Sequence, residues 1–193
     1  KDTTLYAKNA LKATRTKEYH NLVNNSITKN LSLPLNNTTE ENWIDAFMAM
    51  ELTTYRSGWV DNKIRHAFDS IEKRSTEFQR ALLELAYSNY KGKFIDAAER
   101  LMRGTRSPKI FAMAAEHYLA AGTDPNAWNK VVQYFSKRTD KDDNVAAYYG
   151  LLTKLSTGYS EKKDLAWLIS NLKNAIPGQT LLFSFQRKNR NHP

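Results

Sequence analysis

Residues 107–135 read SPKIFAMAAEHYLAAGTDPNAWNKVVQYF and carry the start and stop signals of two consecutive helices. The Ser107 hydroxyl precedes a proline at the first helical position, which is a common order of residues at a helix start. Apolar residues then recur on one face as far as Gly122, where the helix is expected to end because glycine accepts a left-handed backbone. Asp124 and Pro125 repeat the start signal ahead of a second apolar stripe. This stretch therefore predicts a helix, a short turn and a second helix.

The same helical spacing of apolar residues extends along the chain on both sides of this pair. A broad stripe on the N-terminal side consists of Trp43, Ile44, Phe47, Met48, Met50, Leu52 and Tyr55. Thr39 precedes that stripe as a candidate N-terminal cap. Together the stripes predict helix starts near residues 39, 60, 75, 94, 107, 124, 142 and 162. We therefore expect an all-α protein with about eight to ten helices.

Taken in pairs, the predicted helices start near residues 39, 75, 107 and 142, and these starts are 36, 32 and 35 residues apart. A period of about 34 residues is typical of helix-turn-helix repeats, whose short pairs bury their apolar stripes only by stacking on each other. The spacing thus favours antiparallel helix pairs that stack as in an α-solenoid. The alternative is an irregular helical bundle whose elements happen to have similar lengths.

Large, small and aromatic residues follow a fixed order in the pair of helices quoted above. The residues that define this order are Phe111, Ala114, Ala115, Tyr118, Ala127 and Val131. The order resembles the tetratricopeptide repeat over about one repeat, although Thr139 stands where that family has proline. Neighbouring segments match its first helix better than its second. The chain thus looks like a degenerate tetratricopeptide-like or HEAT-like array, and the resemblance assigns no ligand-binding residue.

Both ends of the chain depart from this pattern and suggest a division into three parts. Residues 1–38 contain weaker helical stripes and a loop, and we expect them to pack on the helical array of residues 39–178. Residues 179–193 include the apolar run TLLFSF, which suits a short C-terminal strand. Because a single strand needs a partner, we expect this segment to begin a further domain.

The composition excludes several classes of protein. The chain has 193 residues, a formal net charge of +9 and no cysteine, which rules out disulfides, thiolate nucleophiles and cysteine-based metal sites. No apolar run approaches the ~20 residues that a membrane span requires, so none is predicted. The positive excess lies at both ends and in residues 76–110, where it can attract polyanions or serve solubility. The lack of cysteine suits an exported bacterial protein, periplasmic or secreted, better than a cytoplasmic one, and leaves the compartment open.

The sequence contains no recognisable motif for catalysis or cofactor binding. The seven glycines are isolated, so no phosphate-binding loop can be formed from them, and no G-x-S-x-G or H-E-x-x-H pattern occurs. Asp140, Asp142 and Asn144 match the first ligands of a calcium loop, but Val145 stands where the turn requires glycine. We therefore predict no catalytic residue, no cofactor and no metal site in this segment.

Basic residues gather around one short predicted helix and its flanking turns. The candidates for binding in this group are Lys93, Arg100, Arg103 and Arg106. Such a group is compatible with a stripe that binds nucleic acid or another polyanion. However, Asp96 precedes Arg100 by four residues and Glu99 precedes Arg103 by four, which also predicts ordinary ion pairs on a helix surface.

Aromatic residues are frequent in the last third of the chain, and Tyr148 and Tyr149 are the candidates for recognition there. Stacked helix arrays often present aromatic side chains on a concave surface. Adjacent residues on a helix point about 100° apart. At least one tyrosine of this pair is therefore expected to be partly exposed.

Three functions remain open from the sequence. The favoured one is a non-catalytic helical module that binds a protein partner or an adjacent domain of its own chain. The second is an N-terminal accessory domain of a larger exported bacterial enzyme that acts on cell wall or polysaccharide. The third is a protein that binds nucleic acid or another polyanion through a basic face.

Overall fold

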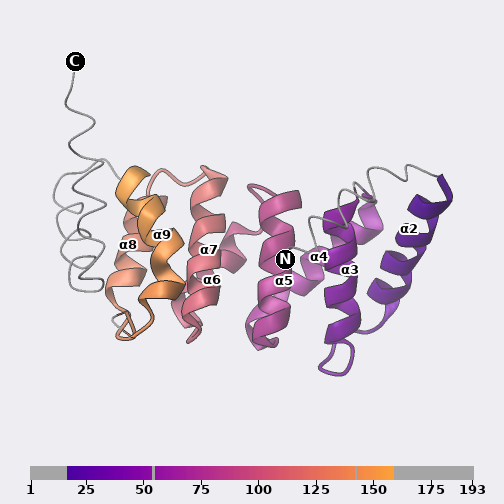
Figure 1. The fold of residues 1–193 in the computed structure, drawn as a ribbon, viewed down its shortest axis with the longest axis horizontal. Helices are drawn as coiled ribbons and strands as arrows, with labels where there is room; N and C mark the ends of the chain where they lie inside the picture. The colour runs from indigo at the N-terminus through magenta and orange to yellow at the C-terminus, as the bar shows by residue number, and fades with distance from the viewer. Residues whose placement is uncertain (1–16, 54, 142, 159–193) are drawn as a thin grey trace, which may run out of the picture.

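A computed structural model describes residues 17–53, 55–141 and 143–158, and these residues form eight α-helices and one short 3-10 helix (Figure 1). In chain order they are α2 (Lys17–Ser32), α3 (Glu40–Leu52), α4 (Gly58–Asp69), η1 (Ile71–Lys73), α5 (Thr76–Asn89), α6 (Ile95–Gly104), α7 (Pro108–Ala121), α8 (Ala127–Ser136) and α9 (Val145–Gly158). The predicted all-α fold is confirmed. The last predicted helix, near residue 162, and the C-terminal segment 179–193 lie outside the described residues.

The helices pack in two layers along an elongated array (Figure 1). The odd layer consists of α3, α5, α7 and α9, each packed against the next. The even layer consists of α4, α6 and α8, and α6 packs on both α7 and α8. α2 packs on α3 and α4 at the N-terminal end of the array. The helices thus form stacked pairs, as the spacing of their start signals predicted.

Serine residues cap three helices because their hydroxyls accept hydrogen bonds from otherwise unpaired backbone amides. Ser57 accepts from Val60 at 3.2 Å at the start of α4, and Ser107 accepts from Ile110 at 3.3 Å at the start of α7. Ser75 caps α5 in the same way. Gly122 ends α7 with a φ of 65°, as predicted.

The predicted cap at Thr39 differs from these three. Thr39 does occupy the position before α3, but its side chain accepts no hydrogen bond from that helix. Its hydroxyl donates instead to the carbonyl oxygen of Pro34 at 2.5 Å. The hydroxyl therefore closes the turn that precedes α3 and does not cap the first amides of the helix.

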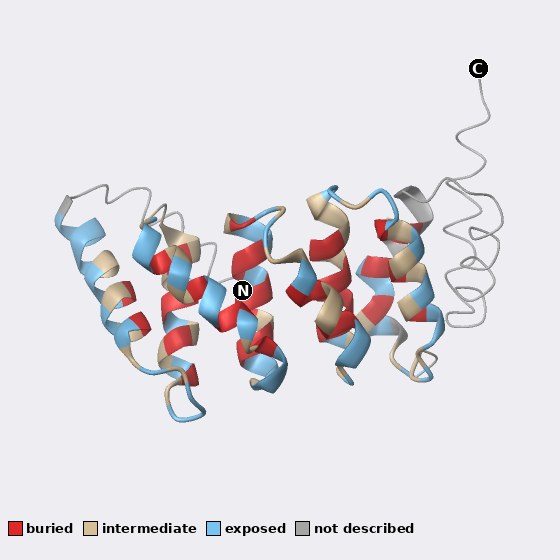
Figure 2. Ribbon diagram, turned by 180° about the vertical axis from the view of Figure 1, so that it is seen from behind, coloured by how far each residue is buried: buried red, intermediate tan, exposed pale blue. Residues whose placement is uncertain are grey.

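The core lies between the two layers, where the buried residues of each helix meet (Figure 2). Aromatic rings connect consecutive helices of the odd layer: Phe47 contacts Phe78 at 5.3 Å between ring centres, and Phe111 contacts Tyr148 at 6.1 Å. Close packing of such large side chains supplies most of the stabilising apolar burial. The core therefore runs along the array and joins each helix pair to the next.

Met48 does not belong to the core, contrary to the broad stripe expected for this helix. Its side chain is 54% exposed, whereas Trp43, Phe47 and Met50 are buried. The reason is geometric, since a residue five positions after Trp43 lies about 140° around the helix from it. The apolar stripe of α3 is consequently narrower than predicted, and Met48 faces solvent.

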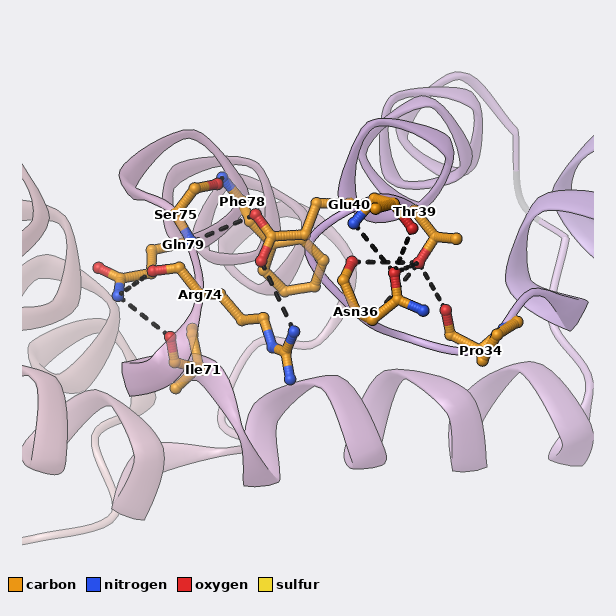
Figure 3. Close-up of polar contacts among 10 residues, drawn as sticks. Pro34, Asn36, Thr39, Glu40, Ile71, Arg74, Ser75, Phe78 and Gln79 are labelled. Carbon is orange, nitrogen blue, oxygen red and sulfur yellow. Dashed lines mark hydrogen bonds and ion pairs between the residues drawn. The ribbon is translucent and has the colours of Figure 1, made fainter.

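A buried carboxylate links the starts of α3 and α5 (Figure 3). Glu40 accepts a hydrogen bond from the backbone amide of Ser75 at 3.2 Å and lies 3.7 Å from a guanidinium nitrogen of Arg74. The Gln79 amide then donates to the carbonyl oxygens of Ile71 and Arg74, both at 3.1 Å. These contacts satisfy backbone groups of the turn between α4 and α5 and hold that turn against α3.

Candidate functional site

Two exposed tyrosines lie on the solvent-facing side of the odd layer, one on α5 and one on α9. We call this surface the odd-helix face; it includes Tyr87 on α5, Met113 and Glu116 on α7, and Tyr149 on α9. Tyr87 is 51% exposed and Tyr149 is 44% exposed, while both α7 residues are half-buried. The two tyrosines therefore lie on the two helices that flank α7.

A lysine connects the three helices of this surface. The Lys154 ammonium on α9 lies 3.1 Å from the Glu116 carboxylate on α7 and 5.2 Å from the centre of the Tyr87 ring on α5. Gly150 leaves room for the carboxylate, because a Cβ atom there would lie 3.1 Å from its Oε1. Because Gly150 has no side chain, the Glu116 carboxylate can approach α9 closely.

A second carboxylate lies beside the Tyr87 ring. Glu84 is one turn earlier on α5, and its carboxylate pairs with Arg80 at 3.4 Å. Both of these side chains are well exposed to solvent, so the pair contributes little to stability. Two carboxylates and a tyrosine ring provide the groups that bind an organic cation, through charge-assisted hydrogen bonds and cation–π contact.

Of the two tyrosines singled out from the sequence, only Tyr149 lies on this surface. Tyr148 is fully buried, and its hydroxyl donates to the Asp140 carboxylate at 3.0 Å while accepting from Arg138. Burial, reinforced by the Asp140 contact, raises the pKa of Tyr148 to about 12. The prediction that adjacent tyrosines diverge is confirmed, and Tyr148 is a residue of the core.

Two of the predicted basic residues are engaged in ion pairs on the even layer. Arg100 lies 3.0 Å from Asp96 and also binds Glu72, and Arg103 lies 2.6 Å from Glu99. The hydrogen bond to Glu72 is the main cause of a raised pKa for Arg100. Both ion pairs expected from the four-residue spacing are therefore present.

The other two basic residues lie at opposite ends of α6. Lys93 is exposed in the turn before this helix, with its ammonium 5.8 Å from the Tyr90 ring, and Arg106 is exposed in the turn after it. A ten-residue helix spans about 15 Å. Lys93 and Arg106 are therefore separated by the length of α6, and Arg100 and Arg103 lie on the helix between them.

A network that the sequence did not reveal joins α6, α7 and α8. Glu99 accepts a hydrogen bond from the Tyr134 hydroxyl at 2.8 Å, and Asp124 binds both the Tyr118 hydroxyl and the Lys130 ammonium, at 2.7 and 2.8 Å. The Lys130 contact is the main reason that the pKa of Asp124 falls to about 2, and burial is the main reason that the pKa of Tyr118 rises to about 12. These groups satisfy one another, so the network holds helices together.

The described residues offer no convergent set of metal ligands. Within residues 17–53, 55–141 and 143–158, no three His, Asp or Glu side chains gather as they would around an ion. His117 is buried, and its Nε2 donates to the carbonyl oxygen of Lys93 at 2.8 Å. In the same part of the chain, no helix combines the length and apolarity needed to cross a membrane.

Comparison with known proteins yields no match: no family model, no curated protein and no solved structure is similar to this chain. The geometry of the odd-helix face is therefore the basis for assigning a function.

Proposed function

We propose that this chain is a non-catalytic helical interaction module, built as a degenerate tetratricopeptide-like or HEAT-like array, that binds a protein partner or an adjacent domain through its odd-helix face. The observation that carries the proposal is the pair of half-exposed tyrosines, Tyr87 and Tyr149, on either side of α7. Exposed aromatic side chains are enriched among the residues that dominate binding energy at protein interfaces. Stacked helices also hold such residues in fixed positions, which lowers the entropic cost of binding.

Site-specific photocrosslinking tests this proposal. A photoreactive phenylalanine analogue replaces Ser88 on α5 or Ala146 on α9, two exposed residues of the odd-helix face, and Arg65 on α4 serves as a matched exposed position on the even layer. In cells that produce the chain naturally, we expect discrete covalent adducts from positions 88 and 146 and none from position 65. No adduct from the odd-helix face, or equal labelling from both layers, would contradict the proposal.

The accessory-domain function stays a prediction, because it depends on residues 179–193, outside the described part of the chain. It requires a catalytic domain in the natural protein after residue 193, and the gene sequence tests this directly.

Polyanion binding also stays a prediction. It requires an affinity for mixed-sequence DNA or RNA that falls steeply with salt and that weakens when Lys93, Arg100 and Arg103 are replaced by alanine. The separation of Lys93 from Arg106 across α6 and the ion pairs of the two arginines favour the protein-interaction proposal over this one.

A further inference from the structure

The odd-helix face already holds a cation of its own. The Lys154 ammonium lies between the Glu116 carboxylate, at 3.1 Å, and the Tyr87 ring, at 5.2 Å from its centre. The side chains of Lys154 and Glu116 are 39% and 30% exposed, so water reaches both groups. Exposed ion pairs and exposed cation–π contacts each contribute only about 0.5–1 kcal/mol. A cation from outside the chain can therefore compete with Lys154 for this position.

Further carboxylates lie on the odd-helix face toward the starts of α3 and α5. On the odd-helix face of α3 and α5, Glu41, Asp45 and Glu77 are exposed and form no ion pair with any described residue. The helix dipole favours acidic residues in the first turn of any helix, which accounts for Glu41 and Glu77. Asp45 lies beyond the first turn of α3, so this explanation does not apply to it. A positively charged ligand that extends from Glu116 toward the starts of α3 and α5 therefore meets further carboxylates, beside the exposed Lys109 at the start of α7.

We infer that the odd-helix face binds a basic peptide segment of a protein partner, whose lysine or arginine side chain takes the place of Lys154 against Glu116 and the Tyr87 ring. This inference rests on the proposed function and specifies the chemistry of the partner. An arginine suits the site well, because its planar guanidinium stacks on an aromatic ring while binding a carboxylate.

The size of the site sets the length of a suitable probe. Two neighbouring helix spacings of 8–10 Å each separate α5 from α9, so about 16–20 Å must be crossed. An extended chain advances about 3.3 Å per residue, which corresponds to about five or six residues. A fluorescein-labelled octapeptide of alternating arginine and alanine therefore covers the site, and the same peptide with glutamate in place of arginine is its control.

Fluorescence anisotropy with the full chain tests the inference through two substitutions with opposite expected effects. Glu116→Gln removes the charge that holds the cation, and we expect it to weaken binding of the arginine peptide by about three- to tenfold. Lys154→Ala removes the internal competitor, and we expect it to tighten binding by about two- to fivefold. Tyr87→Ala should weaken binding by about three- to tenfold, because the cation loses the ring.

Two exposed residues away from the surface control for overall charge. Asp69→Asn on α4 removes one negative charge, as Glu116→Gln does, and Lys137→Ala between α8 and α9 removes one positive charge, as Lys154→Ala does. We expect both controls to change the affinity by less than twofold. Thermal unfolding of every variant shows whether a lost affinity reflects a lost fold.

Equal binding of the glutamate peptide, or weaker binding after Lys154→Ala, would overturn the inference. A nucleic-acid or other polyanion site would give the first result, because the glutamate peptide would then pair with the lysine. Crosslinks from positions 88 and 146 without any binding of the arginine peptide would leave the interaction module standing and remove only the basic partner. Specific binding of the arginine peptide without crosslinks from positions 88 and 146 would support the cation site and contradict the interaction module.

Discussion

The Lys154 ammonium contacts the Tyr87 ring, at 5.2 Å from its centre, although their helices, α9 and α5, lie on opposite sides of α7. This contact is possible because Tyr87 and Lys154 both lean over α7, where Glu116 lies between them. One cation, one carboxylate and one ring thus join three successive helices of the odd layer. A change at any of these positions is consequently expected to affect the other two helices.

Replacement of Gly150 by alanine tests how freely Glu116 moves. Glycine in the middle of a helix costs about 0.5–1 kcal/mol relative to alanine, so Gly150→Ala should stabilise α9 by that amount. The new methyl group would lie 3.1 Å from the Glu116 carboxylate, which can move aside because it ends a flexible, half-exposed side chain. Urea unfolding should show a higher midpoint. A lower midpoint would mean that the carboxylate is held rigidly.

Arg138 connects two turns and should be important for stability. Its guanidinium donates to the carbonyl oxygens of Thr105, at 2.9 Å, and Arg106, at 3.1 Å, and pairs with Asp140 at 2.8 Å. Arg138→Ala leaves two carbonyls and a carboxylate without this partner, and we expect a loss of about 3 kcal/mol in the free energy of unfolding. The neighbouring exposed Lys137→Ala should change it by less than about 0.5 kcal/mol. Similar losses for both variants in chemical denaturation would contradict this role.

The assignment of buried helix faces can be tested by placing a charge on them. Leu85 and Ala115 are both fully buried in the odd layer. Leu85→Asp or Ala115→Asp should abolish cooperative unfolding, because an unpaired buried carboxylate costs more than a small domain can lose. Met48→Asp is the matched control, since the same charge would lie on an exposed position of α3. Sharp melting of both buried variants at the wild-type temperature would show that these faces are assigned wrongly.

His117 should make the stability of the protein depend on pH. Burial lowers its pKa, and its Nδ1 has no hydrogen-bond partner among the described residues, so a second proton would be buried without compensation. The unfolded chain binds that proton near pH 6.5, whereas the folded chain does so only at lower pH. Stability is therefore complete above about pH 6.5 and falls by up to about 1.4 kcal/mol per pH unit as the pH decreases toward the folded pKa.

Denaturation at several pH values between 7.5 and 5 measures this effect. His117→Gln keeps a donor for the Lys93 carbonyl oxygen but does not titrate, so its stability should change less over this range than that of the wild type. His66→Gln, at an exposed position of α4, should retain the wild-type dependence. Equal slopes for the wild type and the His117 variant would exclude His117 as the source.

Part of the candidate site could be predicted from the sequence, and part could not. The sequence predicted that Tyr148 and Tyr149 diverge on a helix, and the structure confirms it, with Tyr148 buried and Tyr149 44% exposed. Glu116 and Lys154 were not predicted to meet. They are 38 residues apart and lie on different helices, and no local spacing relates them. The same holds for the network of Glu99 with Tyr134, whose residues are 35 positions apart.

By itself, the sequence determined the order of the helices from α3 to α9 and most of their buried faces, because caps, glycine and apolar periodicity act within a few residues of the backbone they control. Met48, which is exposed, and Thr39, whose side chain does not cap α3, are the exceptions. It also determined the ion pairs between residues four positions apart on one helix. Only the tertiary structure decided that Tyr87, Glu116 and Lys154 meet on one surface. Contacts between helices depend on how far each helix is shifted and rotated against its neighbour, and the packing of the whole core sets that arrangement.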